Sequence, residues 1–309
     1  MRIHEKIFVA GHSGMLGHAV IEHLKQKRYH NIITKTKEEL DLLDKKAVQD
    51  FFENEKPEYV ILTAATTGAT EDIKNNPAKF LYENITIQNN IIHQSYLSKV
   101  KKLLFYGCVS MYPKQVPQPM QSDYILSSPM NKITEPLGLA KIAGMHMCLE
   151  YNKKYDTKYI VAIPIGLFGK HDNFESENLN LIPSLIRTIK KAKDDKLETL
   201  VLDCSEEFWR EYLYIDDMAD MSVILLRNYP FFEKPINVGT GRIVSTKELA
   251  KCIKRNVGFE GEIEFQETIE LDAAPIGFNR HQTEELAWYP KFRVEEGLKE
   301  VCKFYCENY

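Results

Sequence analysis

The chain has 309 residues, 44% of them hydrophobic and 27% charged, which is typical of a soluble globular protein with room for a large domain and a smaller one. The net charge of −4 gives no reason to expect nucleic acid or an anionic membrane as a partner, and no apolar run approaches the ~20 residues of a membrane span. The six cysteines are scattered without a metal-ligand pattern, and the start of the chain has no signal-peptide pattern. We therefore expect reduced thiols, no bound metal and a cytoplasmic location.

Hydrophobic periodicity predicts strands that alternate with helices in the first part of the chain. Strands are expected at 6–10, 31–34, 58–63, 102–106 and 159–163. Helices are expected after the first strand, where Leu16, Val20, Ile21 and Leu24 share a face, and at 45–53, 77–98 and 136–155. Strand–helix units of this length build a parallel sheet with right-handed crossovers.

After about residue 170 the pattern loosens, with shorter helices expected at 182–193 and 246–257. The fold class predicted is α/β, with a Rossmann-type doubly wound parallel sheet and a smaller C-terminal α/β substrate-binding lobe. We assign residues 1–170 to the nucleotide-binding domain and 171–309 mainly to the substrate lobe, with some chain returning to the first domain.

A glycine-rich turn follows the first predicted strand. The sequence Gly11-His12-Ser13-Gly14-Met15-Leu16-Gly17 is a G-x-x-G-x-x-G motif that opens a helix. Glycines allow the backbone to approach a pyrophosphate, and the helix N-terminus favours its negative charge. A dinucleotide site is predicted here; a glycine turn without a ligand is the alternative.

The end of the second predicted strand bears on the choice between NAD and NADP. An NAD site usually offers an acidic residue there, whereas this chain has Thr34-Lys35-Thr36-Lys37. Basic side chains suit a 2′-phosphate, so we predict NADP(H), with Lys37 as the contact. Two solvated lysines on a surface loop are the alternative.

The stretch 135–144, EPLGLAKIAG, resembles the active-site helix of the short-chain dehydrogenase/reductases. Lys141 stands where that superfamily carries the Lys of Tyr-x-x-x-Lys, and Leu137 stands where it carries the Tyr. A spacing of four places both side chains on one helix face. The superfamily's Tyr exchanges a proton with the substrate oxygen, and Leu has no proton to give.

The whole chain resembles the GDP-L-fucose synthases, which are 4-keto-sugar-nucleotide epimerase/reductases. The matching segments include FVAGHSGMLGHAV (8–20), EELDLLD (38–44), LLFYGCVSMYPK (103–114), GKHDNF (169–174), LIPSLIR (181–187), WREYLYIDDMA (209–219) and INVGTGR (236–242). The resemblance implies NADP(H) as cofactor, a GDP-sugar as substrate, and a homodimer in which helices 77–98 and 136–155 form a four-helix bundle.

The resemblance also assigns residues. It implies cofactor contacts from Gly11, Ser13, Gly14, Met15, Leu16, Lys37, Asp41, Leu42, Ala64, Ala65, Lys141, Pro164 and Leu167. It implies substrate contacts from Asn180, Arg187, Arg210 and Asp272, with Arg210 on the diphosphate. The family's catalytic Ser is Cys108 here, its epimerisation Cys is Ser110, and its epimerisation His is Asn180.

These departures bear on the chemistry. Epimerisation beside a ketone needs two groups that titrate near neutral pH, and neither Ser110 nor Asn180 does so without special activation. Reduction needs orientation and one proton, for which the candidates are Cys108, a hydroxyl such as that of Ser110 or Tyr112, and a water held by the catalytic Lys141. For Cys108, a small packed thiol without a role in proton transfer is the alternative. We predict an NADPH-dependent 4-keto reductase of a GDP-linked deoxyhexose or heptose without 3,5-epimerase activity. The alternatives are a non-catalytic nucleotide-binding subunit and a sugar-nucleotide dehydrogenase or epimerase with a tightly held cofactor.

Overall fold

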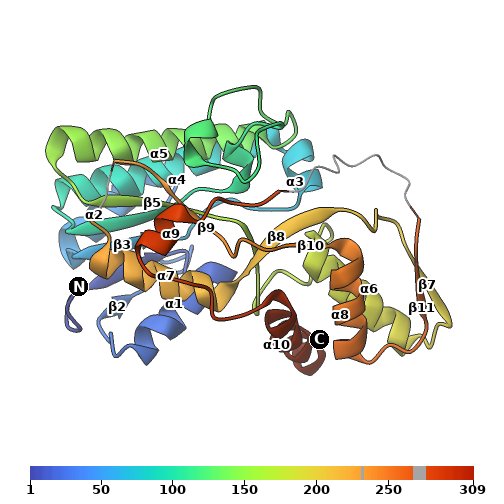
Figure 1. Ribbon diagram of the computed structural model, residues 1–309. Helices are drawn as coiled ribbons and strands as arrows, with labels where there is room; N and C mark the ends of the chain where they lie inside the picture. Colours follow the sequence, from blue (N-terminus) through green and yellow to red (C-terminus); the bar gives the residue numbers. More distant parts are fainter. Residues whose placement is uncertain (231–232, 267–275) are drawn as a thin grey trace.

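The computed structural model describes residues 1–230, 233–266 and 276–309 (Figure 1). Its larger sheet has six strands, all parallel, in the order β2-β1-β3-β4-β5-β9. These strands are β1 (Ile7–Ala10), β2 (Ile32–Ile33), β3 (Tyr59–Leu62), β4 (Lys102–Tyr106), β5 (Tyr159–Pro164) and β9 (Ile236–Val238). The strand order reverses between β1 and β3, which is the doubly wound arrangement predicted.

Helices cover both faces of this sheet (Figure 1). One face carries α1 (Met15–Gln26) and α7 (Ile215–Asn228), which pack against each other. The other carries α2 (Lys45–Glu55), α4 (Pro77–Leu97) and α5 (Glu135–Tyr155), with α4 between α2 and α5. The fold class predicted from the alternating pattern is confirmed.

The rest of the chain forms two small sheets with their own helices. One sheet has the order β10-β8-β6, and the other pairs β11 with β7 in parallel. The strands are β6 (Gly166–Phe168), β7 (Thr199–Leu202), β8 (Trp209–Tyr214), β10 (Ile243–Ser245) and β11 (Glu262–Phe265). Their helices are α6 (Leu181–Asp194), α8 (Thr246–Val257) and α10 (Val294–Asn308), which pack on one another. Outside these sheets, the short α3 (Thr70–Asn75) packs on α4, the short α9 (His281–Glu285) packs on β9, and 3-10 turns lie at η1 (Val109–Met111) and η2 (Ser122–Tyr124).

Strand β9 belongs to the larger sheet although it lies far beyond residue 170. It pairs with β5 through Ala162, Ile163 and Pro164. The chain therefore returns to the first sheet after it has built part of the second lobe. The division at residue 170 stays a prediction.

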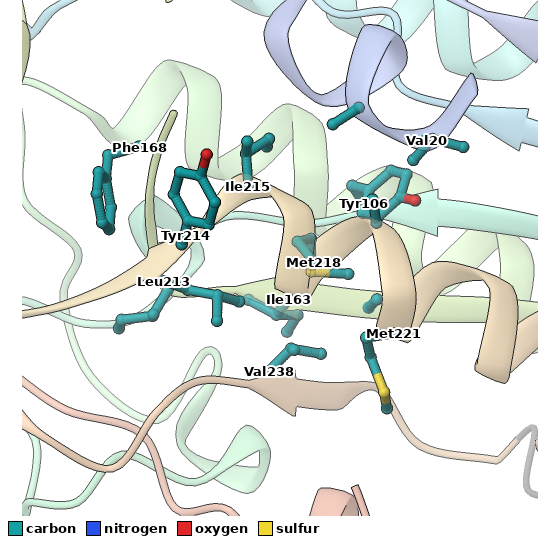
Figure 2. Packing of buried hydrophobic residues seen from close by; sticks show 14 of the residues in the cluster. Val20, Tyr106, Ile163, Phe168, Leu213, Tyr214, Ile215, Met218, Met221 and Val238 are labelled. Carbon is teal, nitrogen blue, oxygen red and sulfur yellow. The ribbon is translucent and has the colours of Figure 1, made fainter. Parts of the chain in front are cut away.

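Side chains of α7 pack against β5 and β9, the last two strands at one end of this sheet (Figure 2). Met218 and Met221 lie beside Ile163 of β5 and Val238 of β9, and all four are buried. Burying these apolar side chains holds the end of β5 in place. The residues that follow β5 are therefore fixed relative to β4 and β3.

The observed bounds differ little from those predicted, except at the sheet edge. The second strand was expected over 31–34, but only Ile32 and Ile33 pair with β1. An edge strand has a single neighbour, so pairing ends where that neighbour turns away. Among the described residues, no helix is both long and apolar enough to cross a membrane.

Candidate active site

Close packing requires glycine at two positions of the turn between β1 and α1. Gly11 has φ +92°, and a Cβ there would lie 2.4 Å from the backbone nitrogen of Ala64, just after β3. A Cβ on Gly17 would lie 2.1 Å from the carbonyl oxygen of Gly11. These contacts bring the start of α1 against the ends of β1 and β3.

The N-terminus of α1 is left open to a ligand. Gly14 is its N-cap residue, so no side chain accepts from the first N–H groups, and no acidic residue lies in the first turn. A Cβ on Gly14 would have its nearest neighbour at 3.7 Å. Free N–H groups at the positive end of a helix bind anions, so these residues fit the diphosphate of a dinucleotide.

A cavity of about 910 Å³ opens at the carboxyl ends of the parallel strands. This is the edge at which open α/β sheets bind their ligands. The residues for which cofactor contacts were predicted all line this cavity: Gly11, Ser13, Gly14, Met15, Leu16, Lys37, Asp41, Leu42, Ala64, Ala65, Lys141, Pro164 and Leu167. Residues that lie as far apart in the sequence as Gly11 and Leu167 thus line one cavity.

Two lysines after β2 reach the cavity wall but differ in their partners. Lys35 Nζ lies 3.5 Å from Glu39 Oε1, and the Glu39 carboxylate also accepts from the Thr36 backbone at 2.8 Å. Lys37 is exposed and makes no ion pair with any described residue. Lys37 is therefore the less constrained cation at this end of the cavity.

The position at which the resemblance implies a tyrosine holds a buried apolar side chain, Leu137. Leu137 is only 8% exposed and forms a small apolar cluster with Ile73 of α3, Phe80 of α4 and Cys108. Leu137 also lines the cavity, so an apolar surface faces the space beside Lys141. The leucine side chain has no hydroxyl, so residue 137 cannot donate a proton.

Lys141 lies one turn after Leu137 and is 7% exposed. Its Nζ is 4.9 Å from the ring centroid of Phe105 in β4, a cation–π contact. Burial lowers the pKa of Lys141, and the nearby Cys108 thiol opposes that shift. Within the described parts of the chain, no carboxylate pairs with this ammonium group.

The other candidates for the proton lie in different surroundings. Cys108 follows β4 and lines the cavity; burial raises the pKa of its thiol, which Lys141 counteracts. Ser110 is not on the cavity wall, and its carbonyl oxygen lies against Gly138, where an added Cβ would come within 2.2 Å. The hydroxyl of Tyr112 donates to Asn237 Oδ1 at 2.5 Å inside the protein.

The second lobe closes one side of the cavity through the segment after β6 and the start of α6. Asn180, the N-cap residue of α6, lines the cavity as predicted for a substrate contact. Asp172 and Asn173 also line it, and the Asn173 N–H donates to Asp172 Oδ1 at 2.8 Å. Burial raises the pKa of Asp172.

Several cavity residues were not predicted from the sequence. Thr66 and Glu83 lie on the wall, and the Thr66 hydroxyl donates to Glu83 Oε2 at 2.6 Å. Asp172 and Asn173 belong to GKHDNF, one of the segments that carries the family resemblance, so a signal for them was present. Thr66 follows directly after Ala64 and Ala65, at the end of a predicted strand.

The predicted substrate contacts in the second lobe lie away from this cavity. Arg187 Nη1 donates to the carbonyl oxygens of Ser176 at 2.8 Å and Phe174 at 3.5 Å. Arg210 stacks its guanidinium 3.7 Å above the Phe208 ring and donates to its neighbour's carbonyl oxygen at 2.7 Å. Neither arginine lines the cavity, and Asp272 lies outside the described residues.

Comparison with known proteins places the chain in a family. Residues 7–239 match the NAD dependent epimerase/dehydratase family. The chain is 38% identical to GDP-L-fucose synthase 1 of Arabidopsis thaliana over 304 residues, which cover 98% of this chain and 94% of that protein. It is 36% identical to the GDP-L-fucose synthase of Escherichia coli (strain K12) over 313 residues, covering 98% and 97%.

Among solved structures, the chain resembles MlghC, a GDP-mannoheptose C4 reductase from Campylobacter jejuni with NADP bound. The TM-score is 0.91 at 32% identity, with 99% of each chain covered. The resemblance predicted from the motifs is thereby confirmed. The chain therefore belongs to the NAD dependent epimerase/dehydratase family, as a divergent relative of the GDP-L-fucose synthases.

Proposed function

We propose that this protein is an NADPH-dependent 4-keto reductase of a GDP-linked sugar, a deoxyhexose or a heptose, without 3,5-epimerase activity. The observation that carries the proposal is that the N-terminus of α1, Lys37 and Lys141 all line one cavity. The Campylobacter jejuni structure supports the same cofactor and substrate class, since it is a GDP-mannoheptose C4 reductase with NADP bound.

The residues of this chain would bind and orient the reactants. The reduced nicotinamide, when bound, supplies the hydride that reduces a carbonyl group. The N-terminus of α1 would hold the diphosphate and Lys37 the 2′-phosphate, because each offers positive charge to an anion. Lys141 would hold the nicotinamide ribose, as the resemblance implies. Pro164 and Leu167 would close the wall beside the nicotinamide.

The loss of epimerase activity follows from the two positions that differ. A hydroxyl and an amide stand where the family uses a thiol and an imidazole, and neither titrates near neutral pH. Ser110 is also off the cavity wall. Asn180 is on the wall and would bind the sugar by hydrogen bonds without moving a proton.

The arginines would bind the nucleotide end of the substrate. Stacking on Phe208 keeps the Arg210 guanidinium in a fixed plane, and its Nη1 donates to the carbonyl oxygen of Trp209. A guanidinium presented in this way suits bidentate recognition of a diphosphate. Arg187 and Asp272 remain candidates for contacts with the same nucleotide.

Helices α4 and α5 would form the contact of a homodimer. A Cβ on Gly144 would lie 2.6 Å from Gln88 Oε1, so the two helices already pack closely within one chain. Their outer surfaces expose apolar side chains, among them Tyr82 and Leu139. A second copy packing there would complete a four-helix bundle.

One observation favours a second candidate, a non-catalytic nucleotide-binding subunit. Leu137 packs in an apolar cluster with Ile73 and Phe80, so this position contributes to the core and offers no proton donor. Such a protein would bind NADPH and turn over nothing.

The two candidates are separated by NADPH consumption with GDP-4-keto-6-deoxy-mannose or a GDP-4-keto-heptose. Wild type is compared with Leu137→Tyr, and Leu137→Phe serves as a control that adds an aromatic ring without a hydroxyl. We expect measurable wild-type turnover, which Leu137→Tyr raises and Leu137→Phe does not, because general acid catalysis is worth roughly 10²–10⁴-fold. No wild-type turnover, with rescue by tyrosine alone, would establish the binding subunit.

Thermal stabilisation gives an independent answer. A working site is stabilised by the GDP-sugar as well as by NADPH, since any ligand of the folded state raises the melting temperature. Stabilisation by NADPH alone favours the binding subunit.

A further inference from the structure

Two of the three hydroxyl groups near the active-site helix are committed to other partners, and the third lies off the cavity wall. Tyr106 lines the cavity, but its hydroxyl is 2.7 Å from Ser222 Oγ within the core. Tyr112 gives its proton to Asn237 at 2.5 Å. Ser110 lies off the cavity wall. None of the three is placed to deliver a proton to a ligand in the cavity.

Cys108 and Lys141 remain, and both line the same cavity. Cys108 packs against the apolar cluster of Leu137, and Leu137 lies one turn before Lys141 on α5, so the two groups lie on neighbouring parts of the cavity wall. The thiol sits at the end of β4 and the ammonium group on α5, one turn from Leu137. Lys141 is more than nine-tenths buried, and no acceptor among the described residues takes a hydrogen bond from its Nζ. A buried ammonium group without an acceptor is costly unless it serves a ligand or a neighbouring thiolate.

Burial acts on the two groups in opposite directions. Loss of solvent raises the pKa of Cys108 and lowers that of Lys141, because it disfavours the charged form of each. Attraction between a thiolate and an ammonium opposes both shifts. Burial therefore brings the pKa values of the thiol and the ammonium group closer together. A smaller difference in pKa lowers the free-energy cost of passing a proton from one group to the other.

Other titratable groups near the pair are already engaged. Ser110 contributes a hydrogen bond to the Cys108 thiol from η1. Glu83 and Asp172 line the same cavity, but Thr66 donates to the first at 2.6 Å and the Asn173 N–H to the second at 2.8 Å. Lys141 is the one cation that acts on the thiol in the described part of the chain.

We propose that Cys108 and Lys141 form a proton relay that replaces the missing tyrosine, with the thiol as donor to the substrate oxygen and the ammonium group as its source. The proposal rests on the proposed reductase function. The S–H bond breaks and leaves its electron pair on sulfur, while an O–H bond forms on the oxygen whose carbon accepts hydride from the reduced nicotinamide. A proton then passes from Lys141 Nζ to the thiolate, and water reprotonates the amine. The cysteine is neither oxidised nor reduced.

The first test needs neither cofactor nor substrate. Alkylation of each cysteine by iodoacetamide is followed across pH by peptide mass spectrometry in wild type, Lys141→Met and Lys141→Arg. A neighbouring opposite charge commonly shifts a pKa by 1–3 units. We therefore expect the pH midpoint of Cys108 alkylation to rise by about one pH unit or more in Lys141→Met. In Lys141→Arg the midpoint should return towards the wild-type value.

The exposed Cys306 is the internal control, and its midpoint should not move. A Cys108 midpoint that is the same in all three proteins would overturn the relay, because the two groups would not be coupled. Circular dichroism of each variant confirms that the comparison is made on folded protein.

The second test is turnover with the GDP-4-keto-sugar. Cys108→Ala should lower kcat by roughly 10²–10⁴-fold while the Kd for NADPH is unchanged, and the same substitution in a Leu137→Tyr background should cost far less. Wild-type turnover that survives Cys108→Ala overturns the relay and leaves the reductase function standing. Absence of wild-type turnover overturns the reductase function and the relay with it.

Discussion

Lys37 and Lys35 lie two residues apart, yet their surroundings predict different contributions to cofactor binding. Lys37→Ala should raise the Kd for NADPH roughly tenfold to a hundredfold and leave that for NADH unchanged, because a hydrogen bond to a charged group is worth about 1.5–3 kcal/mol. Fluorescence titration measures both constants. Lys35→Ala is the matched control, with a smaller effect expected, since Glu39 already holds its ammonium at 3.5 Å. An unchanged NADPH affinity in Lys37→Ala would make this lysine a solvated surface residue.

At the residue scale, the sequence predicted which side chains gather but not all of their partners. The cofactor residues follow strands and glycines in a local pattern, and they do line one cavity. Tyr112 was a candidate proton donor, but its hydrogen bond to Asn237 spans 125 positions and no local pattern reveals it. The same is true of Leu137, whose neighbours Ile73 and Phe80 come from two other helices.

The open N-terminus of α1 predicts opposite effects on binding and stability. Gly14→Asp would place a carboxylate at the N-cap, where it stabilises a helix by about 0.5–1 kcal/mol relative to an uncapped end, but it would also repel a diphosphate. We expect an equal or higher melting temperature and loss of NADPH binding by calorimetry. Gly14→Ala, whose Cβ meets only ordinary contacts, should keep the fold and most of the affinity. NADPH binding by Gly14→Asp at wild-type strength would place the diphosphate elsewhere.

A buried carboxylate of α7 contacts a side chain of α1 where the two helices pack together. Asp220 of α7 lies 3.0 Å from His23 Nε2 of α1 and 3.0 Å from Lys291 Nζ, and Trp288 Nε1 donates to it at 3.3 Å. The close contacts with His23 and Lys291 hold the pKa of Asp220 well below its usual range. The carboxylate therefore adds stability above about pH 4, and that stability is lost as the pH falls further.

This arrangement gives a prediction for Asp220→Asn. The free energy of unfolding in urea should fall by about 1–3 kcal/mol at pH 7, and the difference from wild type should begin to shrink below about pH 4. Asp50→Asn, which breaks a surface ion pair with Lys46, is the control and should change stability by less than about 1 kcal/mol. If the difference in unfolding free energy between Asp220→Asn and wild type stays constant with pH, the charge of Asp220 does not stabilise the contact between α1 and α7.

At the element scale, length decided what could be predicted. The bounds of α4, α5 and the buried strands were predicted to within two residues, because the helices repeat their apolar period over several turns and the strands are continuous apolar runs. The six-residue α3 and the three-residue β9 are too short to show a period. Their places depend on packing against distant parts of the chain, such as the pairing of β9 with β5.

For the whole molecule, the exposed apolar side chains of α4 and α5 predict a dimer contact at these helices. Two charged substitutions on this surface should dissociate the dimer. Tyr82 is 67% exposed and Leu139 is 42% exposed. A Tyr82→Glu, Leu139→Glu double variant should be monomeric by light scattering, since buried unpaired carboxylates would be costly in an interface. Val201→Glu, on an equally exposed apolar residue of β7, should leave the assembly unchanged. A double variant with the wild-type mass would place the contact on another surface.

The return of β9 to the larger sheet has a consequence for how the protein is made. Until Ile236–Val238 have left the ribosome, β5 is the open edge of a sheet of five parallel strands, and its last residues have no partner on that side. An unpaired edge is a template for joining other chains. The nascent chain must therefore wait through more than seventy residues of synthesis before this edge closes. Substitutions that weaken β9 should therefore reduce yield in cells more than their effect on the finished fold suggests.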